Sequence, residues 1–412
     1  MLDPNSGERS KILLVTPVTP WRAFGGTAIA SRNIIQLLSE ALDVSVCCLR
    51  SDEPRYADQQ ANLSVLSGRV SSAQRKLRAL VDQRVGAFAH RQFQRDVVLR
   101  RFSKLVEELR PRFVIFDHIY SSWLVDCIRD ERTMVCYIAH DDMVAYADSL
   151  IAMDPGPFDK MRFRRLRGQY SRLQEKILRR CGYVLTLTTE DANRFKGLRI
   201  EAETELFPIF IEIPQYSRTY PEGFANLLVT GSFDTWEKQK GLSIFLNHIL
   251  MPLLDKCGGF QLVIAGRFSQ SFRRTLPSMP QIRVVDSPLE PVMRELFQEA
   301  SAAAVLDLQI SGLKIKTIEL AGAGLPIVSW AAGLEGTRLV DGKSCLLASS
   351  VDEFVRHLTT LFHDPALRRA LGSEARAAVE TQFSPNNAKR SLTDLKFFRR
   401  LAETGVGRGK PL

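Results

Sequence analysis

Short, continuous apolar runs recur along the first half of the chain, separated by longer stretches that mix apolar and polar residues. A strand has this pattern when helices cover both faces of its sheet, which is typical of parallel sheets. Between the first two runs, Ile29, Ile34, Leu37 and Leu38 keep a helical spacing, and residues 70–110 are helical and polar. The strands are predicted within 11–20, 44–49, 113–118, 134–140 and 183–188.

The pattern restarts in the second half, after a stretch that has no long period. Residues 207–225 are rich in proline and aromatic residues, which is typical of a connection between domains. We therefore predict an α/β fold of two Rossmann-like, doubly wound domains, at 1–215 and 216–385, that face a central cleft. Residues 386–412 form a last helix, which we expect to pack back on the first domain, and a tail. The second domain has its predicted strands at 226–233, 260–267, 282–286, 302–308 and 325–330, and its helices at 241–255, 289–300, 313–322 and 351–382.

Length and composition fit this interpretation and exclude other classes of protein. A chain of 412 residues is long enough for two domains of roughly 200 residues each. Its hydrophobic content of 45% and its charged content of 25% are those of a globular protein. The seven cysteines have no metal-ligand spacing, which indicates reduced thiols in a cytoplasmic protein. No apolar run reaches the roughly 20 residues that span a bilayer, and the polar N-terminus does not resemble a signal peptide.

Positive charge gathers in particular stretches of the chain. The net charge is +10, and residues 164–180 carry many cations with Glu175 as their one acid. Residues 69–110 hold a second arginine-rich set, including 75–78 and 97–101. Such stretches are either solvated faces of helices or surfaces for phosphate, on an anionic membrane, a charged substrate or a nucleic acid. Nucleic acid is the weakest option, because aromatic residues do not alternate with the cations and no zinc-finger or RNP-like motif is present.

The carboxyl ends of the predicted strands are the expected place for a ligand, because open α/β sheets bind ligands at that edge. Gly25 and Gly26, which open the first helix with Thr27, lie there in the first domain. His118 and His140 each end an apolar run at the same edge. Each histidine is either a ligand-binding group or a structural side chain with its hydrogen bonds satisfied.

The stretch SGLKIKTIELAGAGLP (311–326) is the strongest local signal in the second domain. A helix that begins near Leu313 would direct free backbone N–H groups and its positive dipole end toward an anion. Lys316 in its first turn adds a full charge, and Glu319 lies one turn further on the same side. An exposed Lys316–Glu319 ion pair is the alternative, worth a few tenths of a kcal/mol. Lysine before glutamate is the poorer order for such a pair, and the dipole disfavours a lysine at this end.

Residues 313–336 resemble the donor-site segment of the retaining GT-B glycosyltransferases of family four. The shared pattern is a glycine turn, lysine, Glu-x-x-Ala-x-Gly-x-Pro-Ile-Val and then Gly-x-Glu-Gly. Residues 340–348 are similar to a further segment of that family, and 137–142 and 228–242 resemble its central-histidine segment and the start of its second domain. The Ser-Gly-x-x-x-Lys form is most similar to the branch of exopolysaccharide sugar transferases. The resemblance covers nearly the whole chain and is most specific in its C-terminal half.

The resemblance assigns roles to individual residues of this chain. It implies that Glu319 holds the nucleotide ribose, that Lys316 and Lys240 bind the diphosphate, and that His140 contacts hydroxyls of the donor sugar. Cations and N–H groups at the diphosphate would stabilise the leaving group as its charge develops, so that no metal or other cofactor is expected. The implied donor site also contains Gly266, Ser311, Gly312 and Leu313, with Gly25, Gly26 and Thr27 in the N-terminal loop.

Other residues of the two segments have weaker assignments. His118 is the alternative to His140. Asp141 and Asp142 either order His140 or touch the acceptor, and Glu335 is either a site residue or a loop carboxylate. The chain also departs from the family pattern, because Ser311 stands where a sugar-binding glutamate is frequent. Ser232 and Gly182 likewise replace an arginine and an aspartate, and the loop around Ser232 is expected to be longer than usual.

The function implied is a retaining glycosyltransferase of the hexosyltransferase type. It would move a sugar from a nucleoside-diphosphate sugar to a lipid-linked or polysaccharide acceptor in surface-glycan biosynthesis. It would be cytoplasmic, or peripheral at the inner face of the plasma membrane, with nucleotide sugar and acceptor as partners and no nucleic acid. The alternative is a catalytically inactive GT-B-like protein that binds nucleotides or acts as a scaffold. A Rossmann dehydrogenase is disfavoured, because the N-terminal loop lacks GxGxxG and Arg50 follows the second strand instead of an acid.

Overall fold

The chain folds into two compact units in the computed structural model. The model describes residues 12–17, 26–49, 63–66, 95–198, 200–213, 220, 222–224 and 226–403. The first unit comprises Met1–Ile209 and Lys389–Leu412, and the second comprises Phe210–Ala388. The division therefore falls after Ile209 and not at the expected position 215, and the C-terminal residues from Lys389 group with the first unit.

The first unit contains a parallel sheet with the strand order β3-β2-β1-β4-β5-β6-β7. β1 is central, and its Ile12–Val15 pair in register with Phe113–Phe116 of β4 on one side, while β2 pairs on its other side. All five residues of β1 are buried, as the continuous apolar run predicts. The strands are β1 Ile12–Thr16, β2 Val44–Cys48, β3 Leu63–Val65, β4 Phe113–Asp117, β5 Met134–Ala139, β6 Tyr183–Thr186 and β7 Glu203–Leu206.

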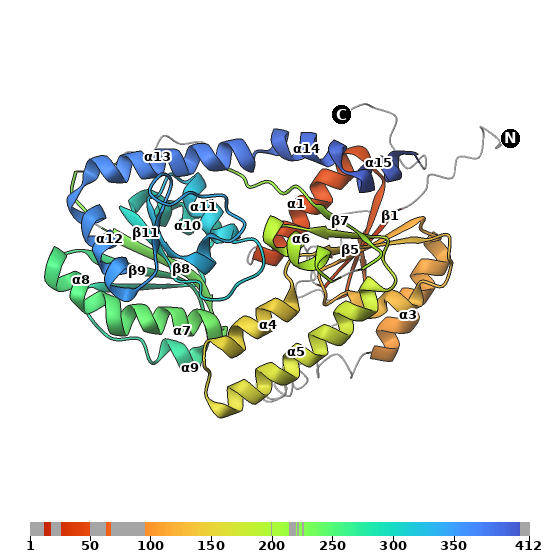
Figure 1. The fold of residues 1–412 in the computed structure, drawn as a ribbon, viewed down its shortest axis with the longest axis horizontal. Helices are drawn as coiled ribbons and strands as arrows, with labels where there is room; N and C mark the ends of the chain where they lie inside the picture. The colour runs from red at the N-terminus through yellow and green to blue at the C-terminus, as the bar shows by residue number, and fades with distance from the viewer. Residues whose placement is uncertain are drawn as a thin grey trace. The chain divides into compact units, whose positions relative to one another are not determined.

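Helices supply the apolar surfaces that bury this sheet. Phe102 of α3 and Tyr170 of α5 belong to the same buried cluster as Val15, Phe116 and Tyr137 of the strands. Each helix contributes through residues at helical spacing, and most of its outward positions are polar. The helices of this unit are α1 Gly26–Ala41, α3 Arg95–Leu109, the 3-10 helix η3 Ser122–Cys127, α4 Met143–Ala152, α5 Pro157–Leu178, α6 Thr189–Lys196 and α15 Lys396–Glu403 (Figure 1).

The second unit repeats the architecture with the strand order β10-β9-β8-β11-β12-β13, also parallel. Phe245 and Leu253 on one side of its sheet pack in one cluster with Phe354 and Leu358 of α12. The two predicted doubly wound domains are thereby confirmed. The strands are β8 Asn226–Phe233, β9 Gln261–Phe268, β10 Ile282–Asp286, β11 Ala302–Val305, β12 Ile327–Trp330 and β13 Leu346–Ala348. The helices are α7 Trp236–Ile244, α8 Leu250–Cys257, α9 Gln270–Arg273, α10 Glu290–Glu299, α11 Ile315–Gly322, the 3-10 helix η5 Ala331–Leu334, α12 Val351–His363 and α13 Pro365–Gln382. α14 Pro385–Asp394 contains the boundary after Ala388 and belongs in part to each unit.

Several predicted helix boundaries differ from those in the structure. The helix expected at 241–255 begins five residues earlier at Trp236, and a π-helical turn at Phe245–Ile249 separates α7 from α8. The predicted helix 351–382 is two helices, because Asp364 caps α13 through the N–H of Leu367 and proline follows it. Residues 386–403 likewise hold parts of two helices, α14 and α15. The short strands β3, β7 and β13 were not predicted, and residues 70–94 of the expected helix lie outside the described residues.

No helix in the described ranges is long and apolar enough to cross a membrane. Among the same residues, no group of three or more His, Cys, Asp or Glu side chains is placed to hold a metal ion.

Candidate active site

Each sheet has one topological switch point, where the chain reverses the direction in which it adds strands. In the first unit β1 and β4 are neighbours there, and in the second unit β8 and β11 are neighbours. Connections on the two sides of such a pair leave in opposite directions, so that a crevice opens at the carboxyl ends of the strands. Each unit therefore has one structurally favoured ligand edge. Most of the described candidate residues lie in loops at these two edges.

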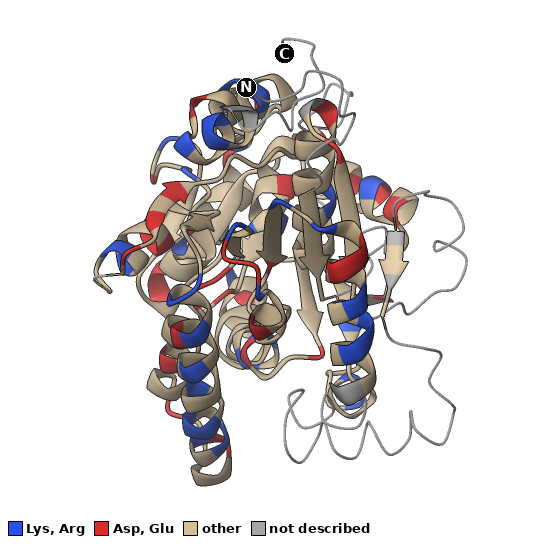
Figure 2. Cartoon of the chain, turned by 90° about the vertical axis from the view of Figure 1, so that its right-hand side faces the viewer, with Lys and Arg blue, Asp and Glu red and all other residues tan. Residues whose placement is uncertain are grey.

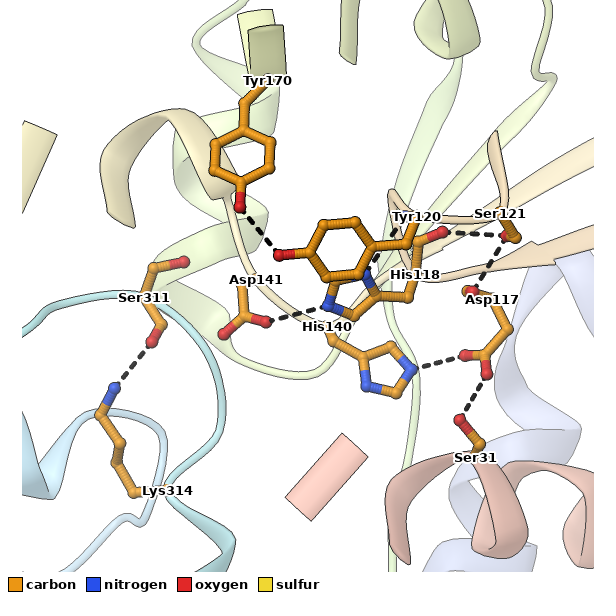
Figure 3. A network of polar contacts seen from close by, with 10 residues as sticks. All are labelled: Ser31, Asp117, His118, Tyr120, Ser121, His140, Asp141, Tyr170, Ser311 and Lys314. Carbon is orange, nitrogen blue, oxygen red and sulfur yellow. Dashed lines mark hydrogen bonds and ion pairs between the residues drawn. The ribbon is translucent and has the colours of Figure 1, made fainter. Parts of the chain in front are cut away.

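Asp117 is the centre of the polar cluster at the edge of the first unit. It is the last residue of β4 and is fully buried. Its Oδ1 lies 2.5 Å from Nε2 of His140, which follows β5, and its Oδ2 accepts a hydrogen bond of 2.5 Å from Oγ of Ser31 in α1 (Figure 3). A buried carboxylate is tolerated only with such partners. The cluster therefore fixes the orientation of the His140 ring.

The charges of Asp117 and His140 stabilise one another. Burial raises the pKa of the Asp117 carboxyl, but the charge and hydrogen bond of His140, with the hydrogen bond of Ser31, together lower it below its usual 3.8. Burial lowers the pKa of the His140 imidazole, but the charge and hydrogen bond of Asp117 raise it above its usual 6.5. Each group therefore favours the charged form of its partner, a carboxylate beside an imidazolium.

The pKa of His118 is shifted in the opposite direction to that of His140, although His118 is adjacent to Asp117. Its backbone is left-handed, with φ of 68°, and its ring stacks on Tyr120 with centroids 4.4 Å apart. The N–H of Tyr120 donates to its Nδ1 at 3.3 Å, so that the ring proton is on Nε2, 3.6 Å from Oδ2 of Asp141 (Figure 3). Burial lowers the pKa of His118 below 6.5, and the hydrogen bond with Asp141 opposes this shift without cancelling it. His118 is thus a neutral ring that orients Asp141.

A pH titration of stability tests the neutral state of His118. As the pH falls below 6.5, the unfolded chain takes up a proton that the folded chain does not. Relative to His118→Asn, the wild type is expected to lose about 1.4 kcal/mol of unfolding free energy per pH unit over that window. Asparagine suits the left-handed backbone. Urea unfolding curves between about pH 7.5 and 5.5 measure the difference, with the exposed His248→Asn as the matched control; parallel curves for wild type and His118→Asn would contradict it.

The expectations for the first unit are met in part. His118 and His140 both lie at the predicted edge. Asp142 instead caps α4, because its Oδ1 accepts hydrogen bonds from the N–H groups of Val144 and Ala145. Asp141 remains the acid of the cluster that a ligand can reach, since its side chain is 29% exposed. Gly26 and Thr27 begin α1, and Gly25 lies outside the described residues.

Asp117 was missed by the sequence interpretation. The signal was available, because an aspartate inside the apolar run FVIFDH is a charge at a buried position. The distance of 86 residues between Asp117 and Ser31 hid the partnership.

The loop that precedes α11 forms the edge of the second unit. Ser311 and Gly312 both have left-handed backbones, with φ of 79° and 77°. Nζ of the buried Lys314 donates to the carbonyl oxygen of Ser311 at 2.7 Å (Figure 3). The N–H of Ser311 donates to Oε2 of Glu335 at 2.7 Å. The loop is therefore held from both sides by charged groups, so Glu335 is not an idle loop carboxylate.

Lys316 differs from Lys314 although they are two residues apart. α11 begins at Ile315, two residues later than expected, and Lys316 lies half-buried in its first turn. Among the described residues Lys316 forms no ion pair or hydrogen bond, so the alternative of a surface pair with Glu319 is wrong. Its charge is left at a helix end that disfavours cations. An anionic ligand would resolve that conflict.

The cations around α7 were only partly predicted. Lys240 lies inside α7 and not before its first residue, and its Nζ is 5.2 Å from the centroid of the Trp236 ring. Lys238, which was not predicted, forms an ion pair with Asp307 just after β11. The expected long loop around Ser232 was wrong, because Ser232 belongs to β8 and only residues 234–235 separate β8 from α7.

The glycine at 266 is required by the approach of two strands. Gly266 on β9 pairs with Gly231 on β8, and a Cβ on Gly266 would lie 1.8 Å from the carbonyl oxygen of Gly231. The next residue, Arg267, pairs in register with Ser232 and forms an ion pair of 2.7 Å with Asp234. A guanidinium is thus present near Ser232, although it comes from the neighbouring strand.

Comparisons with known proteins agree with this geometry. Residues 225–364 match the model of the family Glycosyl transferases group 1. A sucrose-phosphate synthase from Thermosynechococcus elongatus superposes with a TM-score of 0.71 at 14% identity, over 96% of this chain and 100% of that one. The fold is GT-B. No curated protein matches the chain.

Two further GT-B structures are similar over nearly the whole chain. Anabaena Alr3699/HepE, solved in complex with UDP-glucose, has a TM-score of 0.64 at 13% identity and covers 93% of this chain and 100% of its own. The lipopolysaccharide outer core galactosyltransferase WaaB has a TM-score of 0.60 at 14% identity, over 94% of this chain and 99% of its own. The matched domain and the GT-B fold together support a glycosyltransferase. The matched range includes the whole edge of the second unit from Lys238 to Glu335.

Proposed function

We propose that this protein is a retaining glycosyltransferase that moves a sugar from a nucleoside-diphosphate sugar to a lipid-linked or polysaccharide acceptor in surface-glycan biosynthesis. It would act in the cytoplasm, at the inner face of the plasma membrane. The observation that carries the proposal is Lys316, a half-buried lysine without an ion-pair partner among the described residues, in the first turn of α11 within the matched domain. A diphosphate is the ligand that fits this charge and helix end.

In the proposed donor site, different residues of the second unit bind the diphosphate and the ribose of the nucleotide. Lys316 and Lys240 bind the diphosphate, and the carboxylate of Glu319 accepts hydrogen bonds from the two ribose hydroxyls. The carboxylate of Glu335 and the ammonium of Lys314 hold the loop at Ser311, so that the backbone there meets the ligand in a fixed conformation. We propose no metal for this site, since lysines supply the positive charge that a leaving diphosphate needs.

The proposed sugar and acceptor contacts come from the first unit. His140, with its ring fixed by Asp117, binds hydroxyls of the donor sugar, and Asp141, oriented by His118, binds the acceptor hydroxyl. In the retaining step the bond between the anomeric carbon and the phosphate oxygen breaks while the acceptor oxygen attacks from the same face. The acceptor proton passes to the departing phosphate. Similarity to family four supports retention, and this route requires no covalent nucleophile.

Release of nucleoside diphosphate tests the proposal. The purified protein is incubated with UDP- and GDP-sugars and a lipid-linked or oligosaccharide acceptor, and UDP or GDP is measured. Acceptor-dependent release from one donor supports a transferase. The proposal fails if no donor and acceptor pair gives release and if Lys316→Ala also leaves nucleotide binding intact.

One observation favours the second candidate, an inactive GT-B-like nucleotide-binding or scaffold protein. Ser311 is fully buried, and its position carries no carboxylate for the donor sugar. The carboxylate of Glu335 instead accepts a hydrogen bond from the Ser311 N–H. A protein of this kind would show a thermal shift with UDP or GDP without any turnover.

A further inference from the structure

The start of α5 exposes two large apolar side chains on one side of the helix. Phe158 is 84% exposed and Met161 is 67% exposed, which are the largest values for bulky apolar residues in the described ranges. They are three residues apart, so that they lie on neighbouring turns of one face. The opposite face of α5 is buried through Phe163, Tyr170 and Ile177. Single exposed apolar residues are ordinary, but a pair at the tip of one helix indicates a contact surface.

The same outward face of α5 continues as positive charge. Arg165 lies four residues after Met161, and Arg172 lies seven residues after Arg165, so that both continue the same face of the helix. Both arginines are exposed. In the part of the chain that the structure describes, neither arginine forms an ion pair. Other arginines of α5 do, as in the pairs Arg162–Asp159 and Arg167–Asp148. From Phe158 to Arg172 this face extends roughly 21 Å along the helix.

A second basic helix lies in the same unit. α3 packs on the 3-10 helix η3, as α5 does, and exposes Val97 at 40% beside Arg100. Figure 2 looks onto the side on which α3 lies in Figure 1, and the helices there are banded with Lys and Arg. α5 is also connected to the candidate site, because the hydroxyl groups of Tyr170 and Tyr120 are 2.8 Å apart.

We propose that the outward face of α5 docks on an anionic lipid bilayer. Phe158 and Met161 insert at the boundary between head groups and acyl chains, and Arg165 and Arg172 bind lipid phosphates. An interfacial helix combines apolar insertion with attraction of cations to anionic lipid in this way. A nucleic acid or another soluble polyanion would use the arginines but would leave Phe158 and Met161 in water. A role for this docking in presenting a lipid-linked acceptor rests on the proposed function, whereas the docking itself does not.

Vesicle sedimentation of the full chain tests the proposal. The vesicles contain phosphatidylcholine alone or with about 30% phosphatidylglycerol, an anionic fraction at which polybasic surfaces bind. The wild type is expected to sediment with the anionic vesicles only, and less at high salt. Arg165→Gln with Arg172→Gln is expected to weaken partitioning about thirty-fold, and Phe158→Ser with Met161→Ser roughly tenfold or more. The matched controls, Lys256→Gln with Arg369→Gln and Met251→Ser with Leu289→Ser, change exposed residues of the second unit and are expected to bind as the wild type does.

Two results would overturn the inference. The first is a wild type that stays in the supernatant with anionic vesicles at low salt. The second is a Phe158→Ser, Met161→Ser variant that binds vesicles as the wild type does, while a short RNA displaces both; that result would identify a surface for polyanions. Circular dichroism confirms that each variant is folded. Nucleoside diphosphate release with a soluble acceptor is measured on the same variants, so that loss of docking is distinguished from failure of the proposed transferase.

Discussion

Replacing Lys316 with alanine is expected to lower kcat/KM for the donor sugar about 100- to 1,000-fold, the usual effect of removing one group that stabilises charge in a transition state. The leaving diphosphate gains negative charge as the anomeric bond breaks, and Lys316 is the cation of α11 that no protein group neutralises in the described residues. Stability should change by less than about 0.5 kcal/mol, because the lysine makes no ion pair that the mutation could break. Nucleoside diphosphate release and urea unfolding measure the two effects.

Lys343→Ala is the matched control for this experiment. Lys343 lies in the same matched domain, and its exposed side chain pairs with Glu374 at 3.5 Å. Its replacement is expected to leave kcat/KM unchanged. Equal activity of Lys316→Ala and Lys343→Ala would remove the main support for the proposed donor site. A large loss of stability in Lys316→Ala would instead show that the lysine is structural.

Replacing Asp117 with asparagine is expected to destabilise the protein by about 3–5 kcal/mol, the cost of leaving a buried charge without its partner. Asparagine keeps the size of the side chain but removes the charge that raises the pKa of His140. Without the carboxylate the buried His140 either keeps an uncompensated charge or gives up its proton, and the hydrogen bond from Ser31 loses its charged acceptor. Urea unfolding of the variant and the wild type at pH near 7 measures the difference.

Asp148→Asn is the control, because it breaks an ion pair on the protein surface. Asp148 is half exposed and pairs with Arg167 at 2.5 Å, so that its replacement should cost no more than about 1 kcal/mol. The double variant Asp117→Asn with His140→Gln should cost less than the sum of the single variants, since the buried charge is then absent. A cost for Asp117→Asn no larger than that for Asp148→Asn would show that the pair is not held as buried charges.

The amino-acid pattern was sufficient to predict the two sheets, because buried parallel strands need continuous apolar runs. FVIFD and MVCYIA could be recognised for that reason, and both are strands. The strand ETEL could not, since it is short and polar, and pairing with β6 defines it. Helix ends were predicted wrongly where the hydrophobic period does not mark them. Trp236 begins α7 after Thr235, which no hydrophobic period marks, and Pro365 divides two helices that one period spans.

In the candidate site, too, local patterns predicted where residues lie but not which residues they contact. His118, His140, Lys316 and Glu319 could be placed at ligand edges from the strands and helix that precede or contain them. Lys314 and Lys316 look alike in the sequence, and only packing separates them. Nζ of Lys314 reaches the carbonyl of Ser311 inside the protein, and Lys316 does not make such a contact. The sequence could not decide the role of Glu335, because its hydrogen-bond partner Ser311 lies 24 residues away in the chain.

The α/β class, the two doubly wound units and the edges at which ligands are expected could thus be predicted from the sequence alone. These features follow from local apolar patterns and from the rule that ligands bind at the carboxyl ends of parallel strands. The folded structure was needed to learn which polar groups become partners. Ser31, Asp117 and His140 come from three separate elements, and burial makes their mutual contacts obligatory and moves their pKa values. Such contacts depend on distances in space and on the loss of water, which no local pattern encodes.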